Sequence, residues 1–421
     1  MDSNCNKIRI GILTFHRSIN YGAFLQSYAL STTVASSFPD AKVEIIDYCP
    51  LFEIKKYETS LKNFVFGSKY EPQNLWGAFK NIAKLVLMPG ILGQKKSLNN
   101  SFKKSYKHLP LSQKQWITDD FEQFLSDIKN DYDIVIVGSD AVWEYKVFPF
   151  PNAYFLNDKI NCIKMSYAAC SGRMSYSETD ERQRNLLCTF FNGFNYIGIR
   201  DQATEKFLHQ IDCNLQTHHN CDPSFFLDIN NDPLFNKSQV SSLLIEKGID
   251  LNKPIIGIMG GNEMGKMIRS FWGDKYQIVA VYYPNQYADV YLPELTPFEW
   301  AVVFSFFKIT FTRYFHGTIF SLKNGTPTIS IDDWSLGEND QYSKLEDVLI
   351  RTDLKSHYFK VSEMRTESGR KKIKEAAEKF ITEPDSKEIV SGLKKESRYY
   401  KEFETALGLQ IESAKEKCNN V

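Results

Sequence analysis

The residues with the most informative chemistry lie in segment 310–327, TFTRYFHGTIFSLKNGTP. A run of β-branched and aromatic residues ends in Arg313 and His316, and an apolar stretch then closes at Asn324-Gly325. This pattern predicts a strand, a tight turn and a short helix, a unit that holds ligands at the carboxyl ends of strands in α/β proteins. An arginine and a histidine at such a turn can bind an anion and exchange a proton. The alternative is a polar turn whose histidine only caps the helix.

The elements that would position this turn follow a repeated strand–helix pattern. Strand patterns occur at 8–15, 43–48, 133–140, 163–170 and 196–201, and again, after a linker, at 253–260, 277–284, 307–312 and 326–332. Helical patterns lie between most of them. Two series of such units predict an α/β protein with two Rossmann-like doubly wound domains that face each other across a cleft.

The linker sets the expected domain bounds. Residues 1–235 should form an N-terminal Rossmann-like domain with a helical insertion at 50–115, and residues 250–372 a C-terminal Rossmann-like domain. We expect residues 373–421 to form charged helices that pack back on the N-terminal domain. A chain of 421 residues also exceeds the size at which a single core usually stops growing.

Composition argues against several classes of function. Lys+Arg and Asp+Glu are both 51, so the formal net charge is zero, which disfavours a general nucleic-acid binder. The segment GIMGGNEMG lacks the G-x-G-x-x-G spacing, and no P-loop motif occurs, so the signal for bound NAD or ATP is poor. No residues have metal-ligand spacing, and the eight cysteines form no C-x-x-C pair. We therefore expect neither a metal nor a cofactor.

The sequence also bears on location. The start, MDSNCNKIRIGILTF, lacks the features of a signal peptide, and no stretch approaches the roughly 20 apolar residues that span a bilayer. Scattered cysteines fit free thiols in a reducing compartment. These observations predict a cytoplasmic protein that at most lies on the inner face of a membrane.

A series of short blocks runs through the chain in a defined order. The blocks are IRIGILTFH, NYGAFLQSYAL, VEIIDY, DIVIVGSDAVW, NAYFL, KMSYAA, IGIRD, CDPSFFL and TRYFHGTIFSLKNGTPTI, and they cover roughly residues 8–350. Together they resemble bacterial polysaccharide pyruvyl transferases. The resemblance implies the GT-B architecture and phosphoenolpyruvate as the donor substrate. It also implies that pyruvate is attached as a cyclic ketal to a sugar of a surface glycan, such as a capsule or exopolysaccharide.

The resemblance also implies roles for individual residues. Arg200 and His316 match the prominent arginine and histidine of the family. Some relatives carry an arginine two positions before the histidine, where this chain has Tyr314 and places Arg313 one residue earlier. We expect His316 to be catalytic and Arg200 and Arg313 to bind the donor, since arginine pairs bidentately with carboxylate and phosphate. Lys323, two helical turns after His316, is a further donor-binding candidate; the favoured alternative is that its side chain faces solvent.

The first domain offers candidates for the acceptor side. Asp140, in a Gly-Ser-Asp turn, could deprotonate a sugar hydroxyl as a second catalytic residue, or it could cap the next helix. Asn20, Tyr21, Gln26 and Trp143 are candidates for binding sugar hydroxyls and faces. Asn20 and Tyr21 fit a turn and a helix cap equally well.

Two other functions fit the same pattern. A glycosyltransferase that uses a nucleotide sugar would share the paired Rossmann architecture, because fold does not determine function. A non-catalytic glycan-binding subunit of a polysaccharide assembly complex would tolerate neutral replacements at Arg200 and His316.

The insertion 50–115 mixes apolar residues such as Trp76 and Phe79 with many lysines. Residues 76–97 fit a basic amphipathic segment that makes peripheral contact with an anionic membrane. Such contact would suit an acceptor that is still attached to a lipid carrier. The alternative is a helical lid that packs over the acceptor cleft.

Overall fold

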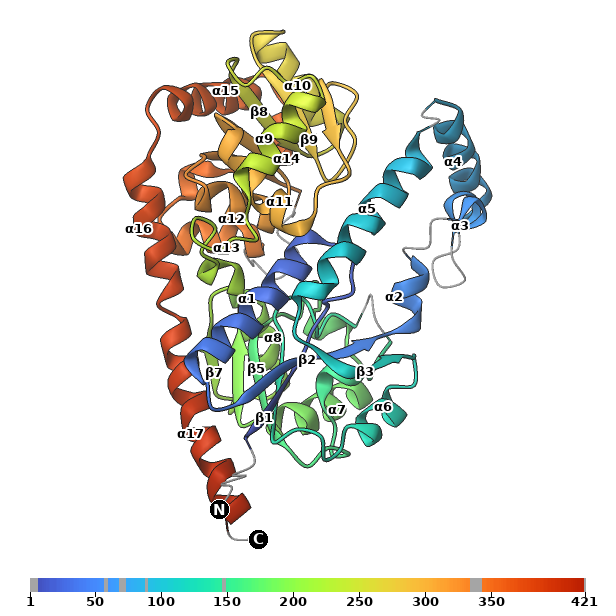
Figure 1. Ribbon diagram of the computed structural model, residues 1–421, viewed down its shortest axis with the longest axis vertical. Coiled ribbons are helices and arrows are strands. Elements are labelled where there is room, and N and C mark those ends of the chain that lie inside the picture. Colours follow the sequence, from blue (N-terminus) through green and yellow to red (C-terminus); the bar gives the residue numbers. More distant parts are fainter. Residues whose placement is uncertain are drawn as a thin grey trace. The chain divides into compact units, whose positions relative to one another are not determined.

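The computed structural model describes residues 7–56, 60–67, 73–87, 90–145, 149–333 and 343–419 (Figure 1). The chain divides into two compact units. Unit 1 comprises Met1–Ala78, Lys107–Phe226 and Arg398–Val421, and unit 2 comprises Phe79–Tyr106 and Leu227–Ser397.

Unit 1 is built on a seven-stranded parallel sheet with the strand order β3-β2-β1-β4-β5-β6-β7. The strands are β1 (Arg9–Leu13), β2 (Lys42–Cys49), β3 (Leu111–Ile117), β4 (Ile134–Val137), β5 (Ile163–Ala169), β6 (Tyr196–Ile199) and β7 (Thr217–His219). Strand β4 reads IVIV and is buried at every position, as expected when helices cover both faces of a parallel sheet. The helices that follow the strands include α1 (Tyr21–Ser37), α6 (Phe121–Asp127), α7 (Glu181–Asn192) and α8 (Gln202–Ile211).

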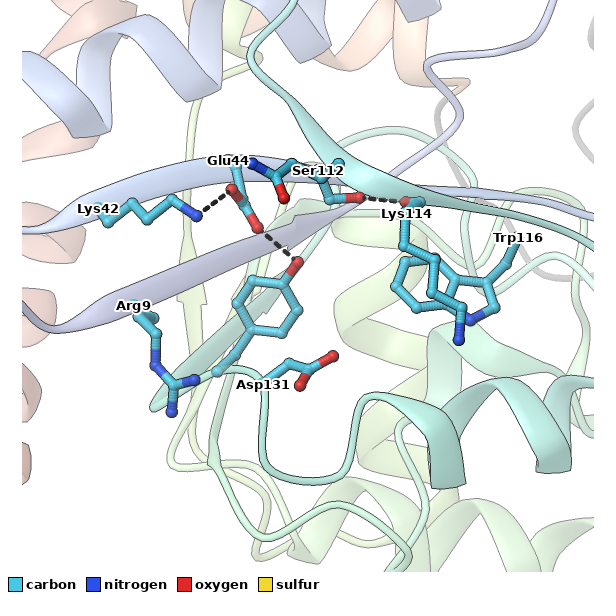
Figure 2. Close-up of a pocket in the computed structure, with 9 residues that line it drawn as sticks. Arg9, Lys42, Glu44, Ser112, Lys114, Trp116 and Asp131 are labelled. Atoms are coloured by element: carbon cyan, nitrogen blue, oxygen red, sulfur yellow. Dashed lines mark hydrogen bonds and ion pairs between the residues drawn. The ribbon is translucent and has the colours of Figure 1, made fainter.

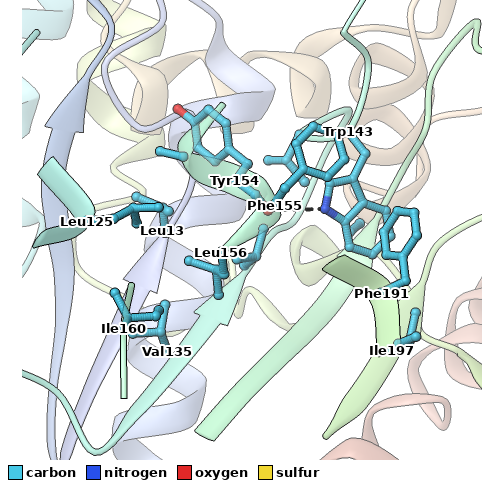
Figure 3. Packing of buried hydrophobic residues seen from close by; sticks show 14 of the residues in the cluster. Leu13, Leu125, Val135, Trp143, Tyr154, Phe155, Leu156, Ile160, Phe191 and Ile197 are labelled. Carbon is cyan, nitrogen blue, oxygen red and sulfur yellow. Dashed lines mark hydrogen bonds between the residues drawn. The ribbon is translucent and has the colours of Figure 1, made fainter. Parts of the chain in front are cut away.

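Aromatic side chains pack among aliphatic ones in the core of unit 1 (Figure 3). Trp143 is 1% exposed, its ring meets Phe191 edge-on at 4.9 Å, and its indole nitrogen donates to the Tyr154 carbonyl at 3.2 Å. Helices α6, α7 and α8 each contribute side chains to this cluster. The core therefore anchors the loop after β4, which carries the predicted site residues Asp140 and Trp143.

Unit 2 contains a six-stranded parallel sheet with the order β10-β9-β8-β11-β12-β13. Its strands are β8 (Ile255–Met259), β9 (Gln277–Val281), β10 (Val290–Leu292), β11 (Ile309–Thr312), β12 (Thr328–Asp332) and β13 (Tyr358–Lys360). Its helices include α9 (Lys237–Glu246), α10 (Asn262–Trp272), α11 (Pro297–Val303), α12 (Phe315–Lys323) and α13 (Lys344–Arg351). The predicted fold class, two parallel-sheet α/β domains of the Rossmann kind, is confirmed.

The C-terminal helices are shared between the units, whereas the sequence led us to expect all of 373–421 on the N-terminal domain. Helix α15 (Glu367–Thr382) buries Ile373, Ala377 and Phe380 in the core of unit 2. Helix α16 (Ser386–Ser397) also belongs to unit 2, and α17 (Tyr400–Asn419) belongs to unit 1. Apolar residues at i, i+4 and i+7 give α15 a face that can cover a sheet, and nothing local in the sequence identifies which sheet.

In its described residues, the insertion 50–115 contains helices, and its last residues belong to β3, which forms the edge of the first sheet. Its helices are α2 (Leu51–Lys56), α3 (Leu61–Phe66), α4 (Leu75–Leu87) and α5 (Ile91–Ser105). Part of α4 and all of α5 cluster with unit 2. In the described part of the chain, no helix is long and apolar enough to cross a membrane.

Candidate functional site

In unit 2, the candidate site lies where the order of the strands reverses, between β8 and β11. Open parallel sheets bind ligands outside the carboxyl ends of their strands at this position. The loop after β8 contains Gly260 and Gly261, and the loop after β11 contains Arg313 and Tyr314. The Arg313 amide donates to the Met259 carbonyl at 3.1 Å, which ties the two loops together.

Helix α12 presents His316 at this edge of the sheet. Tyr314 is the extended N-cap residue, and its amide donates to the Thr312 hydroxyl at 3.1 Å. His316 is the second residue of the helix and retains 8% exposure. A Cβ on Gly317 would lie 2.5 Å from Thr312 Oγ1 and 2.8 Å from Met259 Sδ, so only glycine lets the helix start this close to the strands. The predicted strand, turn and helix at 310–327 are all present.

Arg313 and Lys323, both predicted to bind the donor, lie at different ends of α12. Arg313 is partly exposed and pairs with Asp333, which directly follows β12. Lys323 is the last residue of α12, seven residues from His316, which corresponds to about 10 Å along a helix. Lys323 acts electrostatically on Asp228 and helps to lower the pKa of that carboxyl, after the hydrogen bonds of Asn231. The geometry therefore groups Arg313 with His316 and leaves Lys323 at the far end.

Three tyrosines gather beside this turn. The ring of Tyr283 lies 4.3 Å from that of Tyr282 and 5.5 Å from that of Tyr314. Tyr282 directly follows β9 and has φ 77, a conformation that L-residues rarely adopt and that costs about 1–3 kcal/mol. Burial, followed by the neighbouring tyrosines, raises the pKa of Tyr283 and Tyr314, so both are neutral hydroxyls. Sequence reasoning missed this cluster because its members come from two separate loops.

In unit 1, the loops after β4, β6 and β7 meet in one ion-pair network. Arg200 donates through Nη2 to Asp140 at 2.9 Å and through Nη1 to Asp222 at 2.6 Å. The Arg200 side chain is 1% exposed, that of Asp222 is fully buried and that of Asp140 is 13% exposed. The guanidinium fork is therefore occupied by carboxylates of the chain itself. This argues against the predicted direct contact between Arg200 and a donor.

Asp140 is the member of this network that reaches solvent. Its backbone has φ 78, in the left-handed region; it forms an isolated β-bridge with Ala169, and its carbonyl accepts from the Cys170 amide at 2.9 Å. Strained residues of this kind persist where the surrounding structure holds them, and they cluster at functional sites. Asp140 does not start a regular helix, so the capping alternative does not describe it.

The four predicted acceptor-binding residues serve the structure of unit 1 instead. Asn20 caps α1 by accepting from the amides of residues 22 and 23, which is the alternative role considered for it. Tyr21 and Trp143 are each 1% exposed. Gln26 is fully buried, donates to the Thr14 hydroxyl and accepts from the Ser139 amide at 3.1 Å. Gln26 thus positions the Gly-Ser-Asp turn, and the burial of Tyr21, Gln26 and Trp143 argues against direct contact of these three side chains with a sugar.

A second buried network, which the sequence analysis did not select, surrounds Asp47 at the end of β2. Asp47 accepts from His16 at 3.0 Å, from Arg17 at 2.8 and 2.5 Å, and from Gln115 at 3.0 Å. Burial alone would raise the pKa of Asp47, but the hydrogen bonds from His16 and Arg17 lower it well below its usual range. The polar residues His16 and Arg17 after β1 were the sequence signal for this network. Their partner Asp47 lies on β2, 30 residues after Arg17, so no local pattern connects them.

Unit 1 also contains a hollow of about 270 Å³ at the amino ends of its strands (Figure 2). Lys42 and Arg9 begin β2 and β1, and Glu44 accepts both Lys42 at 2.8 Å and the Tyr132 hydroxyl at 2.9 Å. Ligands of parallel sheets bind at the opposite edge, and these polar groups already pair with one another. The hollow therefore does not form part of the candidate site.

The described residues were also searched for possible metal ligands and for cysteine pairs. Within the described ranges, no group of three or more His, Cys, Asp or Glu side chains could hold a metal ion. The six cysteines for which side chains are described are free thiols, and burial raises the pKa of Cys49 and Cys162.

Two parallel α/β units, each with polar loops at the strand-order reversal, place the chain in the GT-B-like class. A family model described as polysaccharide pyruvyl transferase matches residues 20–335, about three quarters of the chain. The chain belongs to the polysaccharide pyruvyl transferase family, and membership supports a transferase that modifies polysaccharide. No curated protein matched the sequence.

Solved structures agree on the fold. A Listeria monocytogenes protein described as a UDP-N-acetylglucosamine 2-epimerase has a TM-score of 0.55 and 9% identity, and covers 97% of each chain. The Neisseria meningitidis UDP-GlcNAc 2-epimerase, bound to UDP-GlcNAc, has a TM-score of 0.52 and 11% identity over 95% of this chain and 99% of that one. At these identities the likeness shows the fold alone.

Proposed function

We propose that this protein transfers pyruvate from phosphoenolpyruvate to a sugar of a surface polysaccharide or its lipid-linked precursor, and forms a cyclic ketal. The observation that carries the proposal is the family match over 20–335, which includes Asp140, Arg200, Arg313 and His316. We propose that the acceptor sugar belongs to a capsule or an exopolysaccharide. We propose phosphoenolpyruvate as a substrate and no further cofactor.

The proposed reaction needs cationic groups, an acid and a base. A proton is added to the methylene carbon of phosphoenolpyruvate, and a sugar hydroxyl adds to C2. Phosphate then leaves, and a second hydroxyl of the sugar closes the ketal. One hydroxyl proton replaces the proton delivered to carbon, and the other leaves with phosphate, so the atoms balance.

We propose that the donor binds at the edge of unit 2 that carries Arg313 and the start of α12. A helix N-terminus favours an anion, and the Arg313 guanidinium can exchange Asp333 for a carboxylate or phosphate because it is partly exposed. His316, in the first turn of the same helix, is the proposed acid and base. The neighbouring Tyr283 and Tyr314 hydroxyls are neutral and can donate hydrogen bonds to the donor.

We propose Asp140 as the group that takes a proton from the sugar hydroxyl. Its partly exposed carboxylate is held by Arg200, which is itself anchored by Asp222. This revises the expected role of Arg200 from donor binding to positioning. The reason is burial, since a guanidinium with 1% exposure between two carboxylates cannot reach a substrate without breaking both ion pairs.

The direct test supplies the purified protein with phosphoenolpyruvate and candidate glycans or glycolipids. We expect phosphate release together with a gain in acceptor mass of one pyruvate less one water. Release of a nucleoside diphosphate from a sugar nucleotide would instead support a glycosyltransferase. Glycan binding without turnover of either donor would support a non-catalytic subunit.

A further inference from the structure

Helix α4 presents its apolar face to solvent. The helix is amphipathic, and its large apolar side chains recur at i, i+4, i+7 and i+11. These are Leu75, Phe79, Ile82 and Val86, with Trp76 beside them, and all five are exposed. Leu75 is 89% exposed and Val86 is 76% exposed. Contiguous exposed apolar surface of this kind marks an interaction site.

The length of α4 limits the kind of surface that could cover its apolar stripe. A helix of 13 residues is marginal in water by itself, and most helices gain stability by burying the apolar face. At about 1.5 Å per residue, α4 spans roughly 20 Å, which is too short to cross a bilayer. Its partner must therefore be a surface on which it lies.

The charge around α4 indicates the chemistry of that surface. Residues 72–118 contain eight lysines and no Asp, Glu or Arg, although the whole chain has zero net charge. Lys80 on α4 and Lys95 and Lys96 on α5 are exposed. Farther along α5, Lys103 and Lys104 line a groove with Glu294 and Glu299. The excess of positive charge around α4 favours an anionic partner surface.

We propose that α4 and the start of α5 form a membrane-surface element that binds an anionic phospholipid bilayer. The apolar stripe enters the boundary between headgroups and acyl chains, Trp76 lies at the interface, and the lysines contact lipid phosphates. A second copy of the chain fits less well, because it would bring two lysine-rich surfaces together. Residues 88 and 89, which connect the two helices, lie outside the described residues.

The membrane contact deepens the proposed function, since it brings the enzyme to an acceptor carried on lipid. That purpose rests on the proposed pyruvyl transfer, whereas the contact itself does not. The two are separable, because vesicle binding is measured without phosphoenolpyruvate and turnover can be measured on a soluble glycan.

Vesicle flotation of the full-length protein tests the proposal. We expect it to float with vesicles that contain phosphatidylglycerol and to remain behind with phosphatidylcholine alone. Phe79→Glu/Ile82→Glu should weaken binding at least about tenfold through lost apolar burial. Lys95→Glu/Lys96→Glu should weaken it by more than about 25-fold, since each lysine near an anionic surface contributes roughly fivefold, and added salt should weaken binding of the wild type.

Matched controls separate this surface from general effects. Ile245→Glu/Val390→Glu changes two apolar residues that are 59% and 63% exposed elsewhere, and Lys387→Glu/Lys394→Glu reverses two exposed lysines of α16. Both control proteins should float like the wild type. The proposal is overturned if the wild type does not bind phosphatidylglycerol vesicles, or if the α4 and control variants bind equally. It is also overturned if light scattering shows a dimer that Phe79→Glu/Ile82→Glu dissociates, because a second copy then covers the stripe.

Discussion

Arg200 connects Asp140, which is partly exposed, to Asp222, which is fully buried. Removing the guanidinium leaves the Asp222 carboxylate without its counter-ion, so Arg200→Ala should lower the free energy of unfolding by about 3–5 kcal/mol. Urea unfolding measures the change. Arg9→Ala, which removes an exposed ion pair with Asp133, is the control and should cost less than about 1 kcal/mol. A wild-type urea midpoint with a raised KM for phosphoenolpyruvate would instead assign Arg200 to donor binding.

His316 has a different expected signature, because it lies at the start of α12, at the edge of the sheet. We expect His316→Gln to keep the circular dichroism spectrum and melting temperature but to lower turnover on the order of 10²–10⁴-fold. His209→Gln, an exposed histidine of α8 in unit 1, is the matched control. Near-normal turnover of His316→Gln would show that the histidine belongs only to the helix start.

Asp47 should make stability depend on pH. Its folded pKa lies below the unfolded value of about 3.9, so its contribution is fully present above that value and is lost as the pH falls towards the folded pKa. Asp47→Asn should cost at least about 1.5 kcal/mol at neutral pH, because charged hydrogen bonds are lost. The variant should also show a shallower loss of stability in acid than the wild type. Chemical unfolding across pH measures both, with the exposed Asp131→Asn as the control; parallel curves for Asp47→Asn and the wild type would contradict the assignment.

At the scale of elements, the close approach of α12 to β8 and β11 should control activity. The Cβ of Gly317→Ala would contact Thr312 and Met259 at less than 3 Å, so the start of the helix must move. We expect turnover to fall more than stability. Gly93→Ala in α5, where a Cβ meets open space, is the matched control and should stabilise by up to about 1 kcal/mol. Equal turnover of the two variants would show that α12 tolerates the shift.

At the scale of the whole molecule, the C-terminal helices belong to different units. A cavity created in one of these helices should therefore destabilise the sheet of its own unit. Phe403 of α17 is fully buried and meets Tyr167 of β5 at 4.6 Å, whereas Phe380 of α15 lies in the core of unit 2. Phe403→Ala should lower stability by about 3–5 kcal/mol and speed amide exchange in β5 and β6. Phe380→Ala should instead speed amide exchange in β11 and β12. Exchange measured by mass spectrometry would contradict this division if both variants loosened the same sheet.

The sequence by itself determined the local features of this protein. The inner strands of both sheets, the turn after β11 and the family were readable, because burial on both faces produces continuous apolar strands and each short motif is contiguous. The edge strands β3, β7, β10 and β13 were not predicted, since they lack such a continuous buried apolar run. The capping role of Asn20 was also one of the two roles predicted for it, because a helix cap involves only neighbouring residues.

Only the tertiary structure decided which polar residues remain exposed and which pair with one another. Arg200 pairs with residues 60 and 22 positions away, and Gln26 bonds to a turn 113 residues away, so their burial depends on packing that no local pattern records. The same holds for α15 and α17, whose similar amphipathic patterns cover different sheets. An apolar or charged side chain specifies the kind of partner that it needs, but the fold of the whole chain selects the partner.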